Sequence, residues 1–118
     1  LVYNEFPLMG DGFLPHAYNH LSPFWLNAFE NISFVQFVHR WLGVSAMLLI
    51  LLYAGRAIFS LGRKEPVFML LVLMAGTQVG LGIATLLTSV YLPLAVFHQM
   101  GAAVLVILMT VSLYRTRP

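Results

Sequence analysis

The sequence contains no cysteine, which excludes disulfides, cysteine-ligated zinc and iron–sulfur clusters. Charge is scarce as well: 8% of the 118 residues are Asp, Glu, Lys or Arg, whereas soluble domains carry roughly 25%. So little charge cannot cover a water-facing surface of this size, and a lipid-facing surface resolves the shortage. The formal net charge is only +2 and the basic residues are scattered, so nucleic acid is not an expected partner.

Familiar catalytic groupings are also missing. The sequence has no evident nucleophile–base pair, no phosphate-binding glycine loop and no pair of neighbouring carboxylates. We therefore predict no catalytic residue in this segment and expect it to be inactive alone. If the whole protein is an enzyme, its redox chemistry belongs to a cofactor.

Apolar sequence is abundant: 60% of the residues are hydrophobic and the mean hydropathy is +0.88. Three stretches, at about residues 33–59, 66–90 and 92–114, each hold the roughly 20 residues that cross a bilayer core. Each must be a helix, because an isolated strand cannot satisfy its backbone in lipid. The short connections make consecutive spans antiparallel. The predicted fold is an all-α membrane protein, with residues 33–118 as its three-span domain.

Residues 1–32 are different in character and read as the end of a preceding helix followed by an outer loop. Leu1–Tyr3 resemble the tail of an apolar segment, so we expect the chain to be part of a longer protein. Prolines, glycines and asparagines then supply turn chemistry. Ser22-Pro23 predicts the start of a short helix, with Pro23 at its first position. An amphipathic helix on the membrane surface is expected from its aromatic face: Phe24, Trp25, Ala28 and Phe29.

The basic residues predict the orientation. Five of them fall at one membrane face: Arg56, Arg63, Lys64, Arg115 and Arg117. The opposite face has Arg40 alone, beside a loop that carries three acidic residues. The positive-inside rule then places the C-terminus in the cytoplasm or matrix and the proline-containing loop outside.

Two histidines are the main functional signal. His39 and His98 each lie about six residues into a span that begins at the outer face, roughly 9 Å deep at 1.5 Å per residue. Histidine inside a membrane usually marks a site, and two at one depth predict a metal centre between their helices. Heme with two axial histidines is the natural candidate. Zinc and copper are less favoured because no third ligand lies at that depth. A hydrogen bond between helices is the alternative for either ring.

Neighbouring residues fit a bulky planar ligand. Gly43 lies one turn beyond His39, and Gly101 one turn beyond His98, which leaves room for the edge of a porphyrin. Arg40 is expected to pair with a heme propionate or to extend to the lipid headgroups. Gln36 either lines the pocket or caps the helix entry.

Three further features have simpler interpretations. His16 and His20 lie in the polar loop and are read as solvated side chains. Gly76-xxx-Gly80 predicts close packing between two helices.

Five motifs follow one another over nearly the whole chain: Asn4-Glu-Phe-Pro-Leu-Met-Gly10, Phe29-Glu-Asn31, Val35-Gln-Phe-Val-His-Arg40, Thr77-Gln-Val-Gly-Leu-Gly-Ile-Ala-Thr-Leu-Leu87 and Pro93-Leu-Ala-Val-Phe-His-Gln99. In this order they resemble the C-terminal half of heme A synthase, of the proteobacterial and mitochondrial type. The resemblance implies a membrane oxidoreductase that converts the C8 methyl group of heme O into the formyl group of heme A for cytochrome c oxidase. It also implies a multi-pass protein of the bacterial or mitochondrial inner membrane.

The family is built from two homologous four-helix bundles. The resemblance implies that the N-terminal half holds the substrate heme O. It also implies that the C-terminal half, which the present chain resembles, binds heme b through His39 and His98. Gln36 stands where the N-terminal half has a glutamate implicated in catalysis, which fits a cofactor-binding half. Expected partners are the membrane, the N-terminal half, and heme O synthase or cytochrome c oxidase assembly factors. The alternatives are a b-type electron-transfer subunit of another oxidoreductase, and a membrane anchor.

Overall fold

The computed structural model describes residues 2–60, 62 and 65–116, and every regular element within them is helical. The elements are η1 (Phe24–Leu26), α1 (Asn27–Glu30), α2 (Ile32–Gly55), its π-helical continuation η2 (Arg56–Ser60), α3 (Pro66–Leu87) and α4 (Leu92–Arg115). By length and composition, Ile32–Ser60, Pro66–Leu87 and Leu92–Arg115 can each cross a membrane. The predicted all-α fold with three spans is confirmed.

The ends of the spans have local causes. Asn31 caps α2, since its side-chain oxygen accepts hydrogen bonds from the backbone N–H groups of Ser33 (3.1 Å) and Phe34 (3.3 Å). Helix α3 ends at Leu87, three residues before the predicted end. The chain leaves the helix there because Ser89 and Val90 adopt left-handed backbone angles, with φ of 53° and 66°.

The segment before α2 contains the predicted short helix, formed by η1 and α1. Pro23 precedes its first residue, whereas the sequence had suggested that Pro23 occupies the first helical position. Asn27 is fully buried and donates to the carbonyls of Leu21 (3.0 Å) and Phe24 (2.9 Å), which ties the loop to this helix. Val2 and Tyr3 are not helical, and Leu1 lies outside the described residues.

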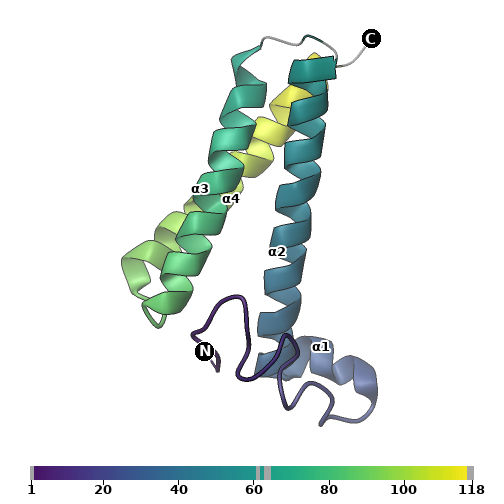
Figure 1. The fold of residues 1–118 in the computed structure, drawn as a ribbon, viewed down its shortest axis with the longest axis vertical. Coiled ribbons are helices and arrows are strands. Elements are labelled where there is room, and N and C mark those ends of the chain that lie inside the picture. The colour runs from purple at the N-terminus through teal and green to yellow at the C-terminus, as the bar shows by residue number, and fades with distance from the viewer. Residues whose placement is uncertain (1, 61, 63–64, 117–118) are drawn as a thin grey trace.

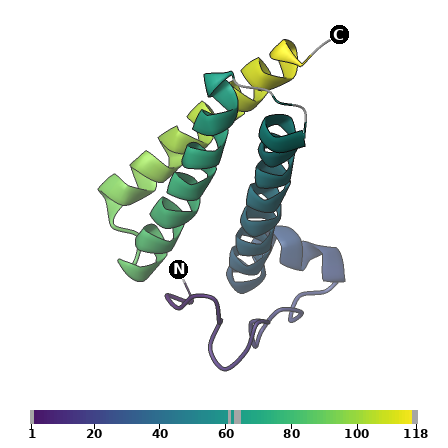
Figure 2. The same cartoon turned by 45° about the horizontal axis from the view of Figure 1, so that its top comes forward.

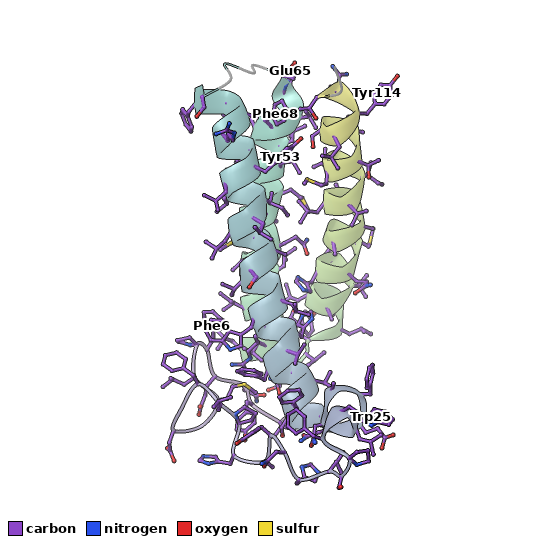
Figure 3. The ribbon with its side chains drawn as sticks, turned by 90° about the vertical axis from the view of Figure 1, so that its right-hand side faces the viewer. Phe6, Trp25, Tyr53, Glu65, Phe68 and Tyr114 are labelled. Atoms are coloured by element: carbon purple, nitrogen blue, oxygen red, sulfur yellow. The ribbon has the colours of Figure 1, made fainter. Side chains whose placement is uncertain are left out.

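Helix α3 packs against both α2 and α4 (Figures 1 and 2). Residues 2–31 and the α3–α4 turn gather at one end of the bundle, which we term the loop end. At the opposite end the helices close on a core in which Phe68 and Leu71 are fully buried, and Phe68 lies 6.0 Å from Tyr53 between ring centres (Figure 3). Any ligand space must therefore lie nearer the loop end.

The predicted packing role of Gly76-xxx-Gly80 is wrong for the part of the chain that the structure describes. Both glycines are exposed, and a Cβ added to either would meet no described atom within 4 Å. At 3.6 residues per turn, residues two positions apart on a helix point in nearly opposite directions. Gln78 lies two positions from each glycine and is buried, so both glycines point away from the neighbouring helix. Gln78 packs against Gly101 of α4 instead.

Candidate functional site

His39 and His98 face each other, with ring centres 6.3 Å apart and ring planes at 81°. His39 lies seven residues beyond Ile32, where α2 begins, and His98 lies six residues beyond Leu92, where α4 begins. Both helices run away from the loop end, so similar offsets place the two rings at similar depth (Figure 1). The proximity of the two rings follows the sequence prediction. His16 and His20 are exposed in the loop and do not line the cavity beside this pair.

The ring of His98 rests on the backbone of α3 at Gly82. A Cβ added to Gly82 would come within 3.1 Å of Cε1 of His98, closer than most real contacts. Nδ1 of His98 is buried and has no hydrogen-bond partner, whereas the side chain of His39 is exposed. Glycine at position 82 is therefore what allows this ring to lie between α3 and α4. No pattern in the sequence signals this role of Gly82.

A cavity of about 370 Å³ extends along the two rings. Its volume falls within the range of about 300–1,000 Å³ that is typical of small-molecule sites. Most of the wall is apolar and comes from all three spans: Val44, Ala46, Met47, Ile50, Ala75, Val79, Ile83, Leu86, Ala102 and Leu105. The polar residues of the wall are Gln36, His39, Arg40, Gln78, Thr85 and His98. The site thus combines a large apolar surface with a few polar groups.

The spacing of the histidines fits two axial ligands on one metal atom. A histidine nitrogen binds a metal at about 2 Å, and its ring centre lies about 1 Å farther away, so two opposed ligand rings have centres about 6 Å apart. The observed 6.3 Å matches, and the 81° between planes is compatible because each ring can rotate about its metal–nitrogen bond. Among the described residues, no group of three or more His, Cys, Asp or Glu could hold a metal ion. A planar cofactor that supplies the equatorial ligands itself fits this donor set.

Gln36 and Arg40 bind the N-terminal segment, a contact that the sequence did not reveal. The side-chain oxygen of Gln36 accepts from the N–H of Tyr3 (3.2 Å), and its amide donates to the Tyr3 carbonyl. Arg40 donates to the carbonyls of Leu8 (2.9 Å) and Tyr3 (3.2 Å). We call residues 2–12 the N-terminal strap.

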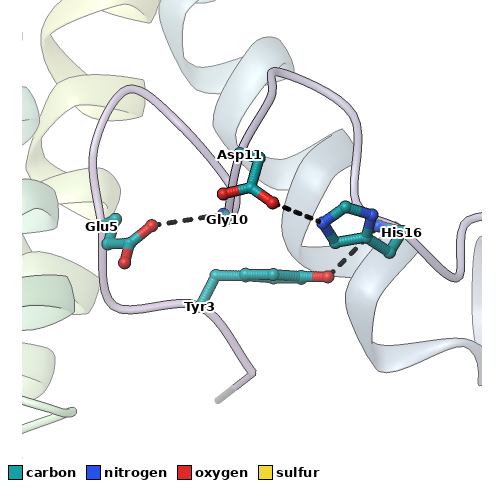
Figure 4. A network of polar contacts seen from close by, with 5 residues as sticks. All are labelled: Tyr3, Glu5, Gly10, Asp11 and His16. Atoms are coloured by element: carbon teal, nitrogen blue, oxygen red, sulfur yellow. Dashed lines mark hydrogen bonds and ion pairs between the residues drawn. The ribbon is translucent and has the colours of Figure 1, made fainter.

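The strap reaches across the loop end of the cavity. Asn4 donates a hydrogen bond of 2.9 Å to the hydroxyl of Ser89 in the α3–α4 turn, and Phe6 forms part of the cavity wall. The strap also has internal support, because Glu5 accepts from the N–H of Gly10 (3.2 Å) and the Tyr3 hydroxyl accepts from the N–H of His16 (Figure 4). The strap therefore connects α2 to the α3–α4 turn at the loop end of the histidine pair.

The two glycines predicted to accommodate a porphyrin edge differ in position. Gly43 lines the cavity, and a Cβ added there would meet nothing within 4 Å among the described residues. Gly101 is buried at the contact between α3 and α4, where an added Cβ would collide with the side chains of Gln78 and Met74. The prediction for Gly101 is therefore corrected: Gly101 lets two helices approach, because α4 turns it toward α3 and away from the cavity.

These two glycines provide a matched test. Gly43→Ala and Gly101→Ala gain the same helix propensity, about 1 kcal/mol, so their difference isolates the tertiary contact. We expect the free energy of unfolding of Gly101→Ala to lie about 1–3 kcal/mol below that of Gly43→Ala, because only Gly101→Ala overpacks an interface. Unfolding in detergent micelles, after removal of any bound cofactor, measures the difference. Equal stabilities would contradict the packing described for Gly101.

The fold and the site define an all-helical, multi-pass membrane protein in which a histidine pair faces an apolar cavity. The chain belongs to the COX15-CtaA family, described as cytochrome oxidase assembly proteins, whose family model matches residues 1–110. No solved structure gives a significant match.

Its curated relatives include heme A synthases of bacteria and mitochondria. The chain is 45% identical to the heme A synthase of Rhodospirillum centenum over 119 residues, which cover 99% of the chain and 32% of that protein. It is 43% identical to Homo sapiens heme A synthase COX15 over 107 residues, which cover 89% of the chain and 26% of that protein. The heme A synthase of the Wolbachia of Brugia malayi is 40% identical over 105 residues. The chain thus spans about a third or less of these relatives.

Proposed function

We propose that this chain is the heme b-binding, C-terminal half of a heme A synthase, the oxidoreductase that converts the C8 methyl group of heme O into the formyl group of heme A. The observation that carries the proposal is the 6.3 Å separation of the His39 and His98 rings beside an apolar cavity. The relatives named heme A synthase support the same assignment. Heme A made by the whole enzyme would serve cytochrome c oxidase.

Each residue of the site has a role in this proposal. His39 and His98 would hold the heme through their ring nitrogens, and the open space at Gly43 would accommodate part of the cofactor. Nε of Arg40 is buried without a partner, so it can donate to a propionate while the other guanidinium nitrogens hold the strap. Gln36 holds the strap and cannot act as a general base, since an amide does not ionise. Bound heme would supply one-electron chemistry.

The wider architecture is also part of the proposal. A fourth helix from a preceding part of the protein would complete a four-helix bundle, and an N-terminal half would hold heme O. The loop end faces the periplasm or intermembrane space, with η1 and α1 on the membrane surface. The C-terminus lies in the cytoplasm or matrix. Arg56 and Arg115 support this orientation, while Arg63, Lys64 and Arg117 lie outside the described residues. Heme O synthase and oxidase assembly factors are the proposed partners.

Deletion of the gene tests the proposed function. Hemes extracted from the deletion strain should contain heme O and no heme A, and the intact gene should restore heme A. A b-type electron-transfer subunit or a membrane anchor would leave heme A in place. Unchanged heme A in the deletion strain would refute the proposal.

A further inference from the structure

Thr85 of α3 differs from the other threonines in and beside the spans. Three of them donate their hydroxyl to the carbonyl four residues earlier, at 2.7–2.9 Å: Thr77, Thr88 and Thr110. This bond satisfies a hydroxyl in an apolar setting without any tertiary partner. The hydroxyl oxygen of Thr85 is buried and has no partner, although the same carbonyl position exists for it. A buried hydroxyl without a hydrogen bond costs about 1–3 kcal/mol.

A second unpartnered polar atom belongs to another residue of the same cavity wall. Nδ1 of His98 is also buried and unpaired, and the ring rests on Gly82 of α3. Thr85 follows Gly82 by three positions, so it lies on the same face of α3, one turn closer to the loop end. Thr85 and His98 both line the cavity. The same wall therefore holds an imidazole nitrogen and a hydroxyl that each need a partner.

We infer that the Thr85 hydroxyl accepts a hydrogen bond from Nδ1–H of His98 when Nε2 of that ring binds heme iron, which makes Thr85 a positioning residue. The inference rests on the proposed function. A histidine that binds a metal almost always donates its other N–H group, and this bond orients the ring and raises the basicity of the ligand. The ring can turn toward Thr85 because the torsion between Cβ and an aromatic ring is broad.

Gln78, the other polar residue of α3 in the cavity wall, is held elsewhere. Its amide oxygen could accept a hydrogen bond, but the amide group is packed against Gly101 at the contact between α3 and α4. A hydroxyl both accepts and donates, so Thr85 satisfies the requirement.

The test compares Thr85→Val, Thr85→Ser and Thr77→Val in the protein purified from its own membrane. Valine preserves the shape of threonine and removes the hydroxyl. Thr77 is the matched control, because it is exposed on the same helix and its hydroxyl is bonded to the Leu73 carbonyl. The measurements are the rate of heme transfer to a scavenging apoprotein and the midpoint potential of the heme whose signal requires His98.

Thr85→Val should lose this heme about tenfold faster than the parent. Its midpoint potential should rise, because a less basic imidazole stabilises ferric iron less. Thr85→Ser should restore both values, and Thr77→Val should match the parent. Parent-like values in Thr85→Val, or equal changes in Thr77→Val, would overturn the role of Thr85 alone. A parent without any bis-histidine heme would overturn the proposed function, and this inference with it.

Discussion

Replacement of either His39 or His98 with alanine should abolish the low-spin spectrum of a heme bound by two imidazoles. The rings are 6.3 Å apart, and either substitution removes one of the two nitrogen ligands. Among the described residues of the cavity wall there is no further His, Cys, Asp or Glu that could replace the lost imidazole. Absorption and electron paramagnetic resonance spectra of the protein purified from its own membrane measure the loss.

His16→Ala is the matched control for these variants. Its side chain is 70% exposed in the loop before η1, and its ring nitrogen lies 3.8 Å from a carboxylate oxygen of Asp11 (Figure 4). This variant should keep the full spectrum. Imidazole added to His98→Ala should restore part of the signal, because the deleted side chain leaves space of the same shape beside Gly82. An unchanged spectrum in both His39→Ala and His98→Ala would exclude the proposed ligand pair.

Simultaneous substitution of Gln36 and Arg40 with alanine should release the N-terminal strap. The two side chains supply five hydrogen bonds to backbone groups of Val2, Tyr3 and Leu8. Each is worth about 1 kcal/mol net, so even two of them correspond to a shift of about thirtyfold in the opening equilibrium. Hydrogen exchange at the backbone of residues 2–8 should therefore accelerate at least about tenfold.

The consequence for the cofactor can be measured in the same variant. An open strap withdraws Phe6 from the cavity wall and admits water at the loop end, and the variant also lacks the proposed bond from Arg40 to a propionate. Heme loss should therefore accelerate while the bis-imidazole spectrum remains. Gln99→Ala is the control, because Gln99 follows His98 directly but is exposed on α4. Exchange rates in Gln36→Ala/Arg40→Ala that equal those of Gln99→Ala would show that the strap has other anchors.

The spans and the histidine pair could be predicted because both depend on local properties of the chain. Hydropathy and length identify a bilayer-crossing helix, and a fixed rise per residue converts the positions of His39 and His98 into depth. The predicted end of α3, at residue 90, is three residues too late. Hydropathy placed it there because the sequence stays apolar through Val90, but the backbone leaves the helical conformation at Ser89, and hydropathy carries no information on φ.

The glycines and the strap show where local reasoning fails. Gly76, Gly80 and Gly101 are equally small, yet only Gly101 meets a neighbouring helix, because contact depends on how each helix is rotated about its axis. Gln36 was expected to line the pocket or cap the helix entry, and Arg40 to pair with a propionate or extend to the headgroups. Both line the cavity, but both also bind backbone more than 30 residues earlier in the chain, and no sequence periodicity encodes such a contact.

The sequence by itself determined an all-helical membrane chain with two histidines at one depth, since burial in lipid leaves a long apolar segment no other stable backbone. Only the tertiary structure decided that His98 rests on Gly82, that Gly101 meets Gln78, and that a strap crosses the end of the cavity. Lipid tails are as apolar as the side chains, so contact between apolar side chains of two helices gives little hydrophobic stabilisation. The rotation of each helix is therefore decided by close packing and a few hydrogen bonds, and these contacts involve residues distant in sequence.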